Sequence, residues 1–363
     1  MRHTDPAMEA SRILAVCNAC RYCEGYCAVF PAMEHRLHFK QADVYYLANL
    51  CHNCAECYYA CQFAPPHEFA VNVPKVLAEA RLRSYQQYAW PRLLRKPFQK
   101  GMRSTIAAVV LLLLAALPFA RRNGGGMFYA VVPHQAMVAI FGFASLVVLV
   151  IVLAGLGRFW RESGKAGGDS WNPAALARTV RSIATLEYLG SGGRGCTYPN
   201  ERHSQARRWF HQLAAYGFLL CFASTSIAAF YHYGLGRLAP YRYFSLPVVL
   251  GTFGGIGLLI GPAGLYALKR RRDSAIADPK QDGLDLMFLF LLFWNGLTGL
   301  LLLGLRESRL MGPLLMIHLA AVLALFLTLP CGKFVHGVYR SAALLRYAIE
   351  QCRSRQTHSS SKG

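Results

Sequence analysis

The chain has 363 residues, of which 54% are hydrophobic and only 16% are charged, and its formal net charge is +21. This apolar content is higher than a soluble protein needs, so the composition argues against a soluble enzyme and for a membrane protein. A charge of +21 also occurs in nucleic-acid-binding proteins, but the basic residues here are distributed as the positive-inside rule describes for membrane proteins. We therefore expect the lipid bilayer as a partner and no nucleic acid.

The first 61 residues contain the spacing Cys-x2-Cys-x2-Cys-x3-Cys twice. The two runs comprise eight cysteines: Cys17, Cys20, Cys23 and Cys27, then Cys51, Cys54, Cys57 and Cys61. Thiolates select iron–sulfur clusters or zinc, and each run is more closely spaced than one tetrahedral zinc ion requires. Disulfides are a further alternative, but cysteines on the cytoplasmic side of a membrane are kept reduced. The spacing predicts two [4Fe–4S] clusters and hence a protein that carries electrons.

The fourth cysteine of each run is expected to bind the other cluster, as it does in two-cluster ferredoxins. One cluster would then be held by Cys17, Cys20, Cys23 and Cys61. The second would be held by Cys51, Cys54, Cys57 and Cys27. This exchange would fold the two halves of the domain onto each other.

Local patterns around the cysteines are helical. Residues 34–50 contain no glycine or proline, and their apolar residues recur at near-helical spacing, as do those of residues 73–88. We expect a helical ferredoxin-like domain over residues 1–89, followed by a basic connector at 90–103. Residues 1–16 lack the apolar core of a signal peptide, so we expect the cluster domain to remain in the cytoplasm.

Apolar blocks long enough to cross a bilayer follow the connector. Six of them lie at residues 104–120, 133–156, 209–233, 244–268, 284–304 and 313–333. They predict a six-helix transmembrane bundle over residues 104–340, with a cytoplasmic loop at 157–208 and a cytoplasmic tail at 341–363. The first block is short and contains Pro118, and a buried soluble helix is its alternative.

The basic residues indicate the orientation of these helices. If the N-terminal domain is cytoplasmic, the inside segments hold 33 of the 39 lysines and arginines. Positive charges in loops favour the cytoplasmic side. We therefore expect a multi-pass protein of the cell inner (cytoplasmic) membrane, with the cluster domain and both termini in the cytoplasm.

The long cytoplasmic loop contains one amphipathic segment. Leu176, Val180 and Ile183 can share one face of a helix, whereas Arg178 and Arg181 lie elsewhere. This pattern is typical of a helix that lies on the membrane surface.

Histidines near the ends of two predicted membrane helices indicate haem. His211 and His232 begin and end the third helix, and 21 residues, or about 31 Å, separate them. His318 lies early in the sixth helix and His336 just past its end, 18 residues, five turns and roughly 27 Å apart. Ionisable residues in membrane helices are rare and usually functional.

Helix direction predicts how these histidines pair. Because the third and sixth helices run in opposite directions, His211 should meet His336 at the cytoplasmic side, and His232 should meet His318 at the outer side. Two such pairs would bind two b-type haems, which makes the membrane part a cytochrome b-type bundle. The alternative is that these histidines lie among lipid headgroups at helix ends.

Other polar residues are candidates for a quinone site or for contacts near the clusters. His134 and Asn295 are candidates for a quinone site, although His134 also suits the membrane interface. His52 is expected to tune the neighbouring cluster, and His203 has no geometric partner. Four cysteines outside the runs show no sign of an activated nucleophile: Cys196, Cys221, Cys331 and Cys352.

The doubled cysteine run, a loop at residues 190–199 that ends in Cys196-Thr197-Tyr198-Pro199, and the helix at 209–232 together resemble the TcuB family. These are tricarballylate/citrate-utilisation membrane electron-transfer proteins, and the chain is also similar to the C-terminal half of the fused protein CobZ. The likeness extends from about residue 17 to residue 339. It implies a soluble FAD-dependent dehydrogenase that oxidises tricarballylate, whose flavin this protein would reoxidise while it delivers electrons to the quinone pool.

The residues themselves predict an all-α protein in which electrons pass through clusters and haems, and the resemblance implies a flavin as their source and a membrane quinone as their acceptor. They do not identify the substrate, because the chain contains no recognisable flavin or nicotinamide fold and no acid/base constellation. Whether the chain alone counts as an enzyme is also left open. Two alternatives remain: a subunit of a heterodisulfide-type or glycerol-phosphate-type reductase, and a membrane redox sensor.

Overall fold

The chain folds into helices arranged as two parts. The computed structural model describes residues 5–94, 107–108, 111, 128–163, 172–193, 196–197 and 199–360, with the backbone alone at 191–193 and 355–360. Within these residues there is no strand, only an isolated antiparallel bridge between Cys196 and Ser204. The expected all-α class is confirmed for this part of the chain. The first predicted span, at 104–120, falls almost entirely outside it.

The N-terminal part is a small helical domain. Its elements are α1 (Pro6–Cys20), α2 (Val29–Glu34), α3 (Gln41–Leu50), α4 (Glu56–Tyr59), α5 (Val73–Tyr88) and a 3-10 turn at Arg92–Leu94. The first and last helices begin at side-chain caps, because Asp5 accepts from the Ala7 amide and Asn72 accepts from the Lys75 amide. The helix expected at 73–88 is therefore confirmed with its bounds.

The helical pattern at residues 34–50 is realised only in its second part. Helix α2 ends at Glu34 and α3 begins at Gln41. The second helix starts there because Lys40 is extended and its amide donates to the Asp43 carboxylate, 3.1 Å away. Residues 35–40, which the pattern included, are therefore not helical.

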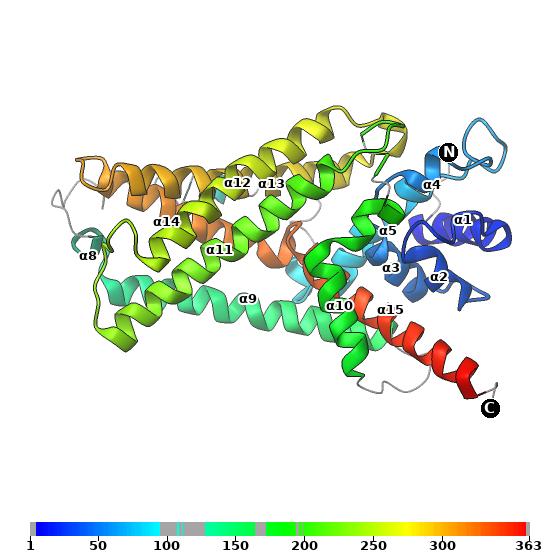
Figure 1. Ribbon diagram of the computed structural model, residues 1–363, viewed down its shortest axis with the longest axis horizontal. Helices are drawn as coiled ribbons and strands as arrows, with labels where there is room; N and C mark the ends of the chain where they lie inside the picture. The colour runs from blue at the N-terminus through cyan, green and yellow to red at the C-terminus, as the bar shows by residue number, and fades with distance from the viewer. Residues whose placement is uncertain are drawn as a thin grey trace.

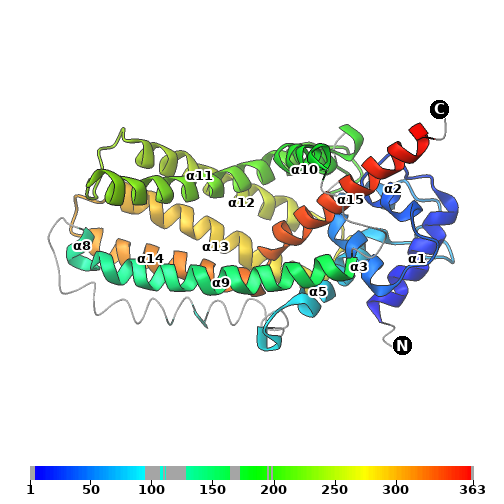
Figure 2. The ribbon, with the colours of Figure 1, turned by 90° about the horizontal axis from the view of Figure 1, so that it is seen from below.

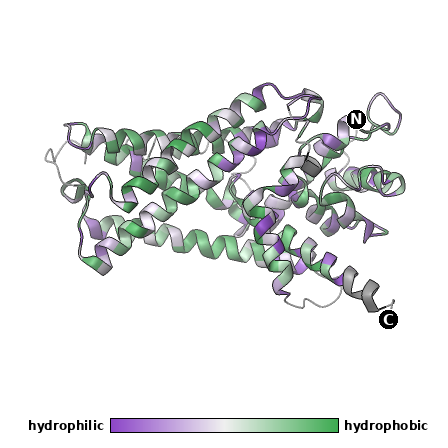
Figure 3. Ribbon diagram, in the orientation of Figure 1, coloured by the Kyte–Doolittle hydropathy of each residue, from purple (hydrophilic) through white to green (hydrophobic). Residues whose placement is uncertain are grey.

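The second part is a bundle of long apolar helices. Five helices in the described residues are long and apolar enough to cross a membrane: α9 (His134–Ser163), α11 (Ala206–Leu235), α12 (Leu246–Arg270), α13 (Pro279–Gly304) and α14 (Met311–Thr328), the last continued by a turn to Cys331. They run side by side away from the N-terminal domain, and a short helix, α8 (Phe128–Val131), lies at the far end (Figures 1 and 2). Hydrophobic residues dominate these helices (Figure 3). The chain is therefore a membrane protein.

Glycines allow α11 and α12 to approach closely. A Cβ added at Gly217 would lie 2.9 Å from the Gly254 oxygen and 3.0 Å from the Gly257 carbonyl carbon. Because backbone rather than a flexible side chain occupies this space, a larger residue there must push the helices apart.

We expect Gly217→Leu to destabilise the bundle by about 1–3 kcal/mol, the usual cost of overpacking a tight contact. Thermal unfolding in detergent should show a lowered midpoint. The matched control is Gly142→Leu on α9, where an added Cβ meets nothing within 4 Å. Equal stability of the two variants would contradict the close contact.

The sixth predicted helix is interrupted. After α14, a 3-10 turn (Leu329–Cys331) follows and α15 (Val335–Ser360) begins. Pro330 lies in the turn and lacks the N–H that would continue the helix. His318 and His336 therefore lie on separate helices, and the argument that placed them five turns apart on one helix was wrong.

The C-terminal residues form a packed helix rather than a tail. Ala343 and Tyr347 on α15 are buried in the same core as α1, α3 and α5. The Arg36 guanidinium also binds the Glu350 carboxylate at 2.7 Å. The predicted tail at 341–363 is thus mostly part of the junction between the two parts (Figure 2).

The amphipathic segment forms α10 (Pro173–Thr185), as expected. Ala175, Thr179 and Ser182 are buried, and the helix packs on α15. Leu176 and Val180 are exposed on its other side. A contact of this apolar side with the membrane surface stays a prediction.

Candidate cofactor sites

The first cysteine set lies where α1 ends and α4 ends. Burial, followed by the charge of Cys61, raises the pKa of Cys17 and of Cys23 to about 12. Cys20 and Cys57 line the same cavity of about 230 Å³ as these three residues. The fold therefore brings the fourth cysteine of the second run to the first three cysteines of the first run.

The second set gathers around the connection between α3 and α4. Burial, followed by the charges of Cys54 and Cys51, raises the pKa of the Cys27 thiol well above its ordinary value. The pKa of Cys57 is raised by burial and by Cys54, Cys27 and Cys51. Cys27 thus lies with the second run, and the exchange of fourth cysteines predicted from the spacing corresponds to the observed neighbours.

The chemistry of these two sets suits iron–sulfur clusters. In the described residues, no three His, Cys, Asp or Glu side chains converge as a single metal ion requires. The sulfurs of the first set instead surround a cavity, as the ligands of a four-iron cube would. In the second set, the Asn53 amide donates to the Cys51 sulfur at 3.4 Å, a contact that tunes cluster potentials. The ligand role of the eight cysteines stays a prediction.

His211 and His336 face each other where the bundle meets the N-terminal domain. Their ring centroids are 6.2 Å apart and the rings are nearly perpendicular, at 79°. Two imidazoles that share one iron have centroids about 6 Å apart, because each iron–nitrogen bond is about 2 Å. The separation therefore fits a bis-histidine haem, and this is the pair that helix direction predicted.

Hydrogen bonding prepares His336 for such a role. Its Nδ1–H donates to the Lys333 carbonyl at 2.7 Å, which leaves Nε2 for a metal. Burial holds the pKa of His336 well below its ordinary value, so the ring is neutral, as metal ligation requires. The Nδ1 of His211 is buried and has no hydrogen-bond partner. Both ligand assignments stay predictions.

The outer pair is arranged differently from the expectation. The His232 ring stacks on that of His134, with centroids 3.8 Å apart, and no ring contact or hydrogen bond joins it to His318. Instead, the Nδ1 of His318 is hydrogen-bonded to the Thr298 hydroxyl at 3.0 Å. Stacked rings at 3.8 Å leave no room for an iron atom between them.

Helix direction could not show this difference. It determines which end of the bundle a histidine occupies but not which helices are neighbours. In the structure α11 packs on α12, α12 on α13, α13 on α14 and α14 on α9. The pairing of His232 with His318 is therefore not the arrangement observed, and the haem role of each residue stays a prediction.

The other polar residues mostly have structural partners. The buried Asn295 amide donates to the carbonyls of Leu291 and Ala321, and so ties α13 to α14. His203, for which no partner was expected, contacts the Glu56 carboxylate at 3.1 Å. The Nδ1 of buried His52 lies 2.8 Å from the Leu50 carbonyl. Only His52 is next to a predicted cluster ligand.

Sequence reasoning missed the placement of Cys196. This residue is buried in one cluster of side chains with Cys54, and its thiol donates to the Leu189 carbonyl at 2.7 Å. The adjacent Thr197 hydroxyl lies 3.4 Å from the Cys54 carbonyl. Cys196 and Thr197, which belong to the loop that carries the family resemblance, therefore lie against Cys54 of the second cysteine set, and their place in that loop was the available signal.

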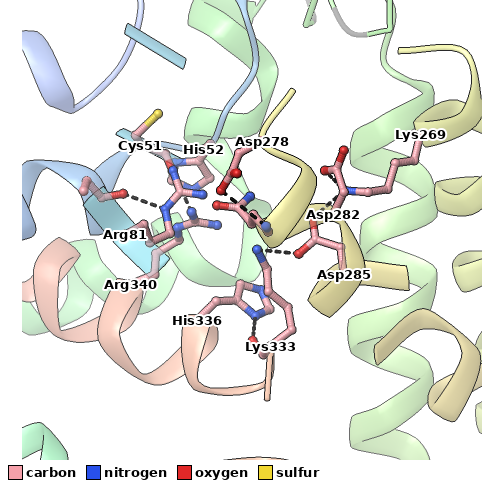
Figure 4. Close-up of polar contacts among 12 residues, drawn as sticks. Cys51, His52, Arg81, Lys269, Asp278, Asp282, Asp285, Lys333, His336 and Arg340 are labelled. Carbon is pink, nitrogen blue, oxygen red and sulfur yellow. Dashed lines mark hydrogen bonds and ion pairs between the residues drawn. The ribbon is translucent and has the colours of Figure 1, made fainter. Parts of the chain in front are cut away.

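A network of buried charges at the same junction was also missed. Asp285 on α13 binds Lys269 at 2.6 Å and Lys333 at 2.7 Å, and Lys269 also binds Asp282 at 2.8 Å. Figure 4 shows this network beside His336. Since Lys333 supplies the carbonyl that orients His336, the network connects two membrane helices to the predicted haem ligand.

Sequence comparison relates both parts of the chain to one family. The family described as Citrate utilization protein B matches residues 98–357, and its Fer4-like domain matches residues 10–87. The chain is 48% identical to Citrate utilization protein B of Escherichia coli over 362 residues, which cover 97% of this chain and 95% of that protein. No solved structure matches the chain.

Proposed function

Since the chain belongs to the Citrate utilization protein B family, we propose that it carries electrons from a soluble FAD-dependent dehydrogenase to a membrane quinone. The membership confirms the resemblance to citrate and tricarballylate utilisation proteins that the sequence predicted. It also confirms that the N-terminal domain is of the Fer4 type, which supports an iron–sulfur role.

The relative's name refers to citrate utilization. On this basis the partner dehydrogenase of the present chain acts on a tricarboxylate, and tricarballylate is the specific candidate. The proposal assigns the oxidation itself to the partner, whereas this chain accepts the electrons.

The observation that carries the proposal is the position of the second cysteine set beside the helix turns of His211 and His336, at the head of an apolar bundle, with the first cysteine set in the same N-terminal domain. Clusters and haems, when bound, exchange single electrons and so divide the electron pair of a reduced flavin. The eight cysteines would hold the clusters in the N-terminal domain. His211 and His336 would hold a haem where that domain meets the membrane helices.

A second b-type haem toward the other end of the bundle is part of the proposal. His318 supports it, because its Nδ1 is already bonded to Thr298 and its Nε2 is left for a metal. Participation of His232 would require its ring to move away from His134.

We further propose that the N-terminal domain and both termini lie in the cytoplasm, at the inner membrane. The distribution of lysine and arginine supports this orientation. Both termini lie at the same end of the molecule, and α5 and α8 lie at opposite ends of the bundle (Figure 1). This arrangement supports the expected even number of crossings.

Reduction of the haems by a substrate-reduced partner tests the function. We expect the purified protein to show haem reduction when it is mixed with the flavoprotein and tricarballylate, and reoxidation when a quinone is added. The measurement is the haem absorbance, with substrate omitted in the control. Haems that stay oxidised beside intact clusters and a reduced partner would refute the proposal.

A further inference from the structure

The connection from α3 to α4 carries Cys51 and Cys54 and has an unusual backbone. Asn53 and Ala55 have φ angles of 54° and 67°, in the left-handed region that non-glycine residues rarely adopt. A side chain in this region strains the backbone, so the surrounding structure must keep this connection in place.

One arginine of the N-terminal domain helps to fix the connection between α3 and α4. Arg81 on α5 is buried, and its guanidinium donates to the carbonyls of Ala48 at 2.7 Å and Cys51 at 2.8 Å. It connects the end of α3 to the body of its own domain.

A second arginine reaches the same carbonyl from the other part of the molecule. Arg340 on α15 donates to the Cys51 carbonyl at 2.6 Å and to the Asn49 carbonyl at 3.2 Å. It lies four residues, or one helical turn, after His336. Figure 4 shows Arg81 and Arg340 converging beside Cys51, with His336 on the same helix as Arg340.

A third arginine repeats this relation on α11. Arg207 donates to the carbonyls of Asn53 at 2.7 Å and His52 at 2.9 Å. It lies one helical turn before His211. His211 and His336, which we call the inner pair, thus each have an arginine one turn away on the same helix. Each of these arginines donates hydrogen bonds to the connection that carries Cys51 and Cys54.

We propose that Arg207 and Arg340 are positioning residues that set the distance between the second cluster and the inner haem, and that this cluster is the one that reduces the haem. The inference rests on the proposed function. It assigns an order to the cofactors, because Arg207 and Arg340 connect the helix turns of His211 and His336 to the backbone of residues 49–53.

The first cysteine set is suited to receive electrons from a soluble partner. Cys20 is exposed, whereas Cys51 and Cys54 are buried. Electrons from a soluble partner would therefore arrive at the Cys17 set and leave through the Cys51 set. Electron transfer slows steeply with distance, so a small displacement of the connection is enough to change the rate.

At these positions arginine differs from lysine in the geometry of its hydrogen bonds rather than in its charge. The planar guanidinium of Arg340 bridges two carbonyls, which a lysine ammonium does not match in shape although it retains the charge. Lysine substitutions therefore remove the bridge and preserve the positive charge that influences cofactor potentials.

The test compares Arg340→Lys and Arg207→Lys with Arg36→Lys in the full-length protein. Arg36 is a matched control, because it is buried and joins the domain to Glu350 on α15 but binds no carbonyl of residues 49–53. Clusters are reduced by a flash-photoreduced deazaflavin. Cluster reduction is followed by electron paramagnetic resonance of freeze-quenched samples, and haem reduction by absorbance.

We expect all three variants to keep their iron and haem contents and their rate of cluster reduction. Haem reduction should be severalfold slower in Arg340→Lys and Arg207→Lys, because the electron-transfer rate falls exponentially with the distance between the two cofactors. Arg36→Lys should behave as the unaltered protein.

Two results would overturn the inference. One is an unaltered haem reduction rate in both test variants, and the other is equal slowing in Arg36→Lys. If clusters of the unaltered protein are reduced but its haems never are, the proposed function fails, and the inference fails with it.

Discussion

Replacing Cys27 with serine is expected to remove the cluster of the second cysteine run, although Cys27 belongs to the first run in the sequence. The physical reason is the observed placement of Cys27 beside Cys51, Cys54 and Cys57. Iron and acid-labile sulfide should fall from about eight atoms of cluster iron per chain to about four. Electron paramagnetic resonance of the reduced protein should lose the signal of one cluster and keep the other.

The reciprocal variant, Cys61→Ser, should lose the cluster of the first run. Cys352→Ser on α15 is the control, because that cysteine belongs to neither set. Since cluster binding and folding are coupled, both test variants should also lower the thermal stability of the domain. If Cys27→Ser and Cys61→Ser lost the same cluster, or if the unaltered protein contained zinc, the predicted ligand sets would be wrong.

Replacing His336 with alanine should remove one b-type haem completely, and His211→Ala should remove the same one. Loss of either imidazole would remove one of the two side chains that would hold the haem, at a site where the two rings lie 6.2 Å apart. The reduced-minus-oxidised absorbance spectrum and the haem content measure the effect. The clusters should be retained, because neither histidine belongs to the cysteine sets.

The control for these variants is His203→Ala, which removes a histidine that contacts Glu56 near the surface of the N-terminal domain. It should keep the full haem content. If the His336→Ala variant retained all its haem, the prediction that His211 and His336 hold one haem would be refuted. His318→Ala and His232→Ala test the outer site separately, and loss of a haem in the first but not the second would show that His318 holds this haem without His232.

Local chemistry made part of this fold predictable. The spacing of the cysteines indicated the type of cofactor, and helix-favouring residues between Asn72 and Ala89 defined α5 to the residue. Apolar length alone located the membrane helices that the structure describes. These properties depend on neighbours within a few residues, so the sequence contains them directly. The exchange of fourth cysteines was predictable only because two-cluster domains share that arrangement.

Other features depended on which residues meet after folding. Helix direction placed His232 and His318 at one end of the bundle, but the packing order of the helices put His134 beside His232. The break at Pro330 separated His318 from the helix that carries His336. Periodicity specifies a face and a level on one helix but carries no information about the neighbour that this face will contact.

The sequence by itself therefore determined the helical class, the membrane helices that the structure describes and the eight predicted cluster ligands, because these follow from local composition and spacing. Only the tertiary structure decided how the cysteine sets connect to the membrane part. Arg340 donates to a carbonyl 289 positions earlier in the chain, and Arg207 donates to carbonyls more than 150 positions earlier. A backbone carbonyl is the same at every residue, so no pattern in the sequence marks which one an arginine will bind.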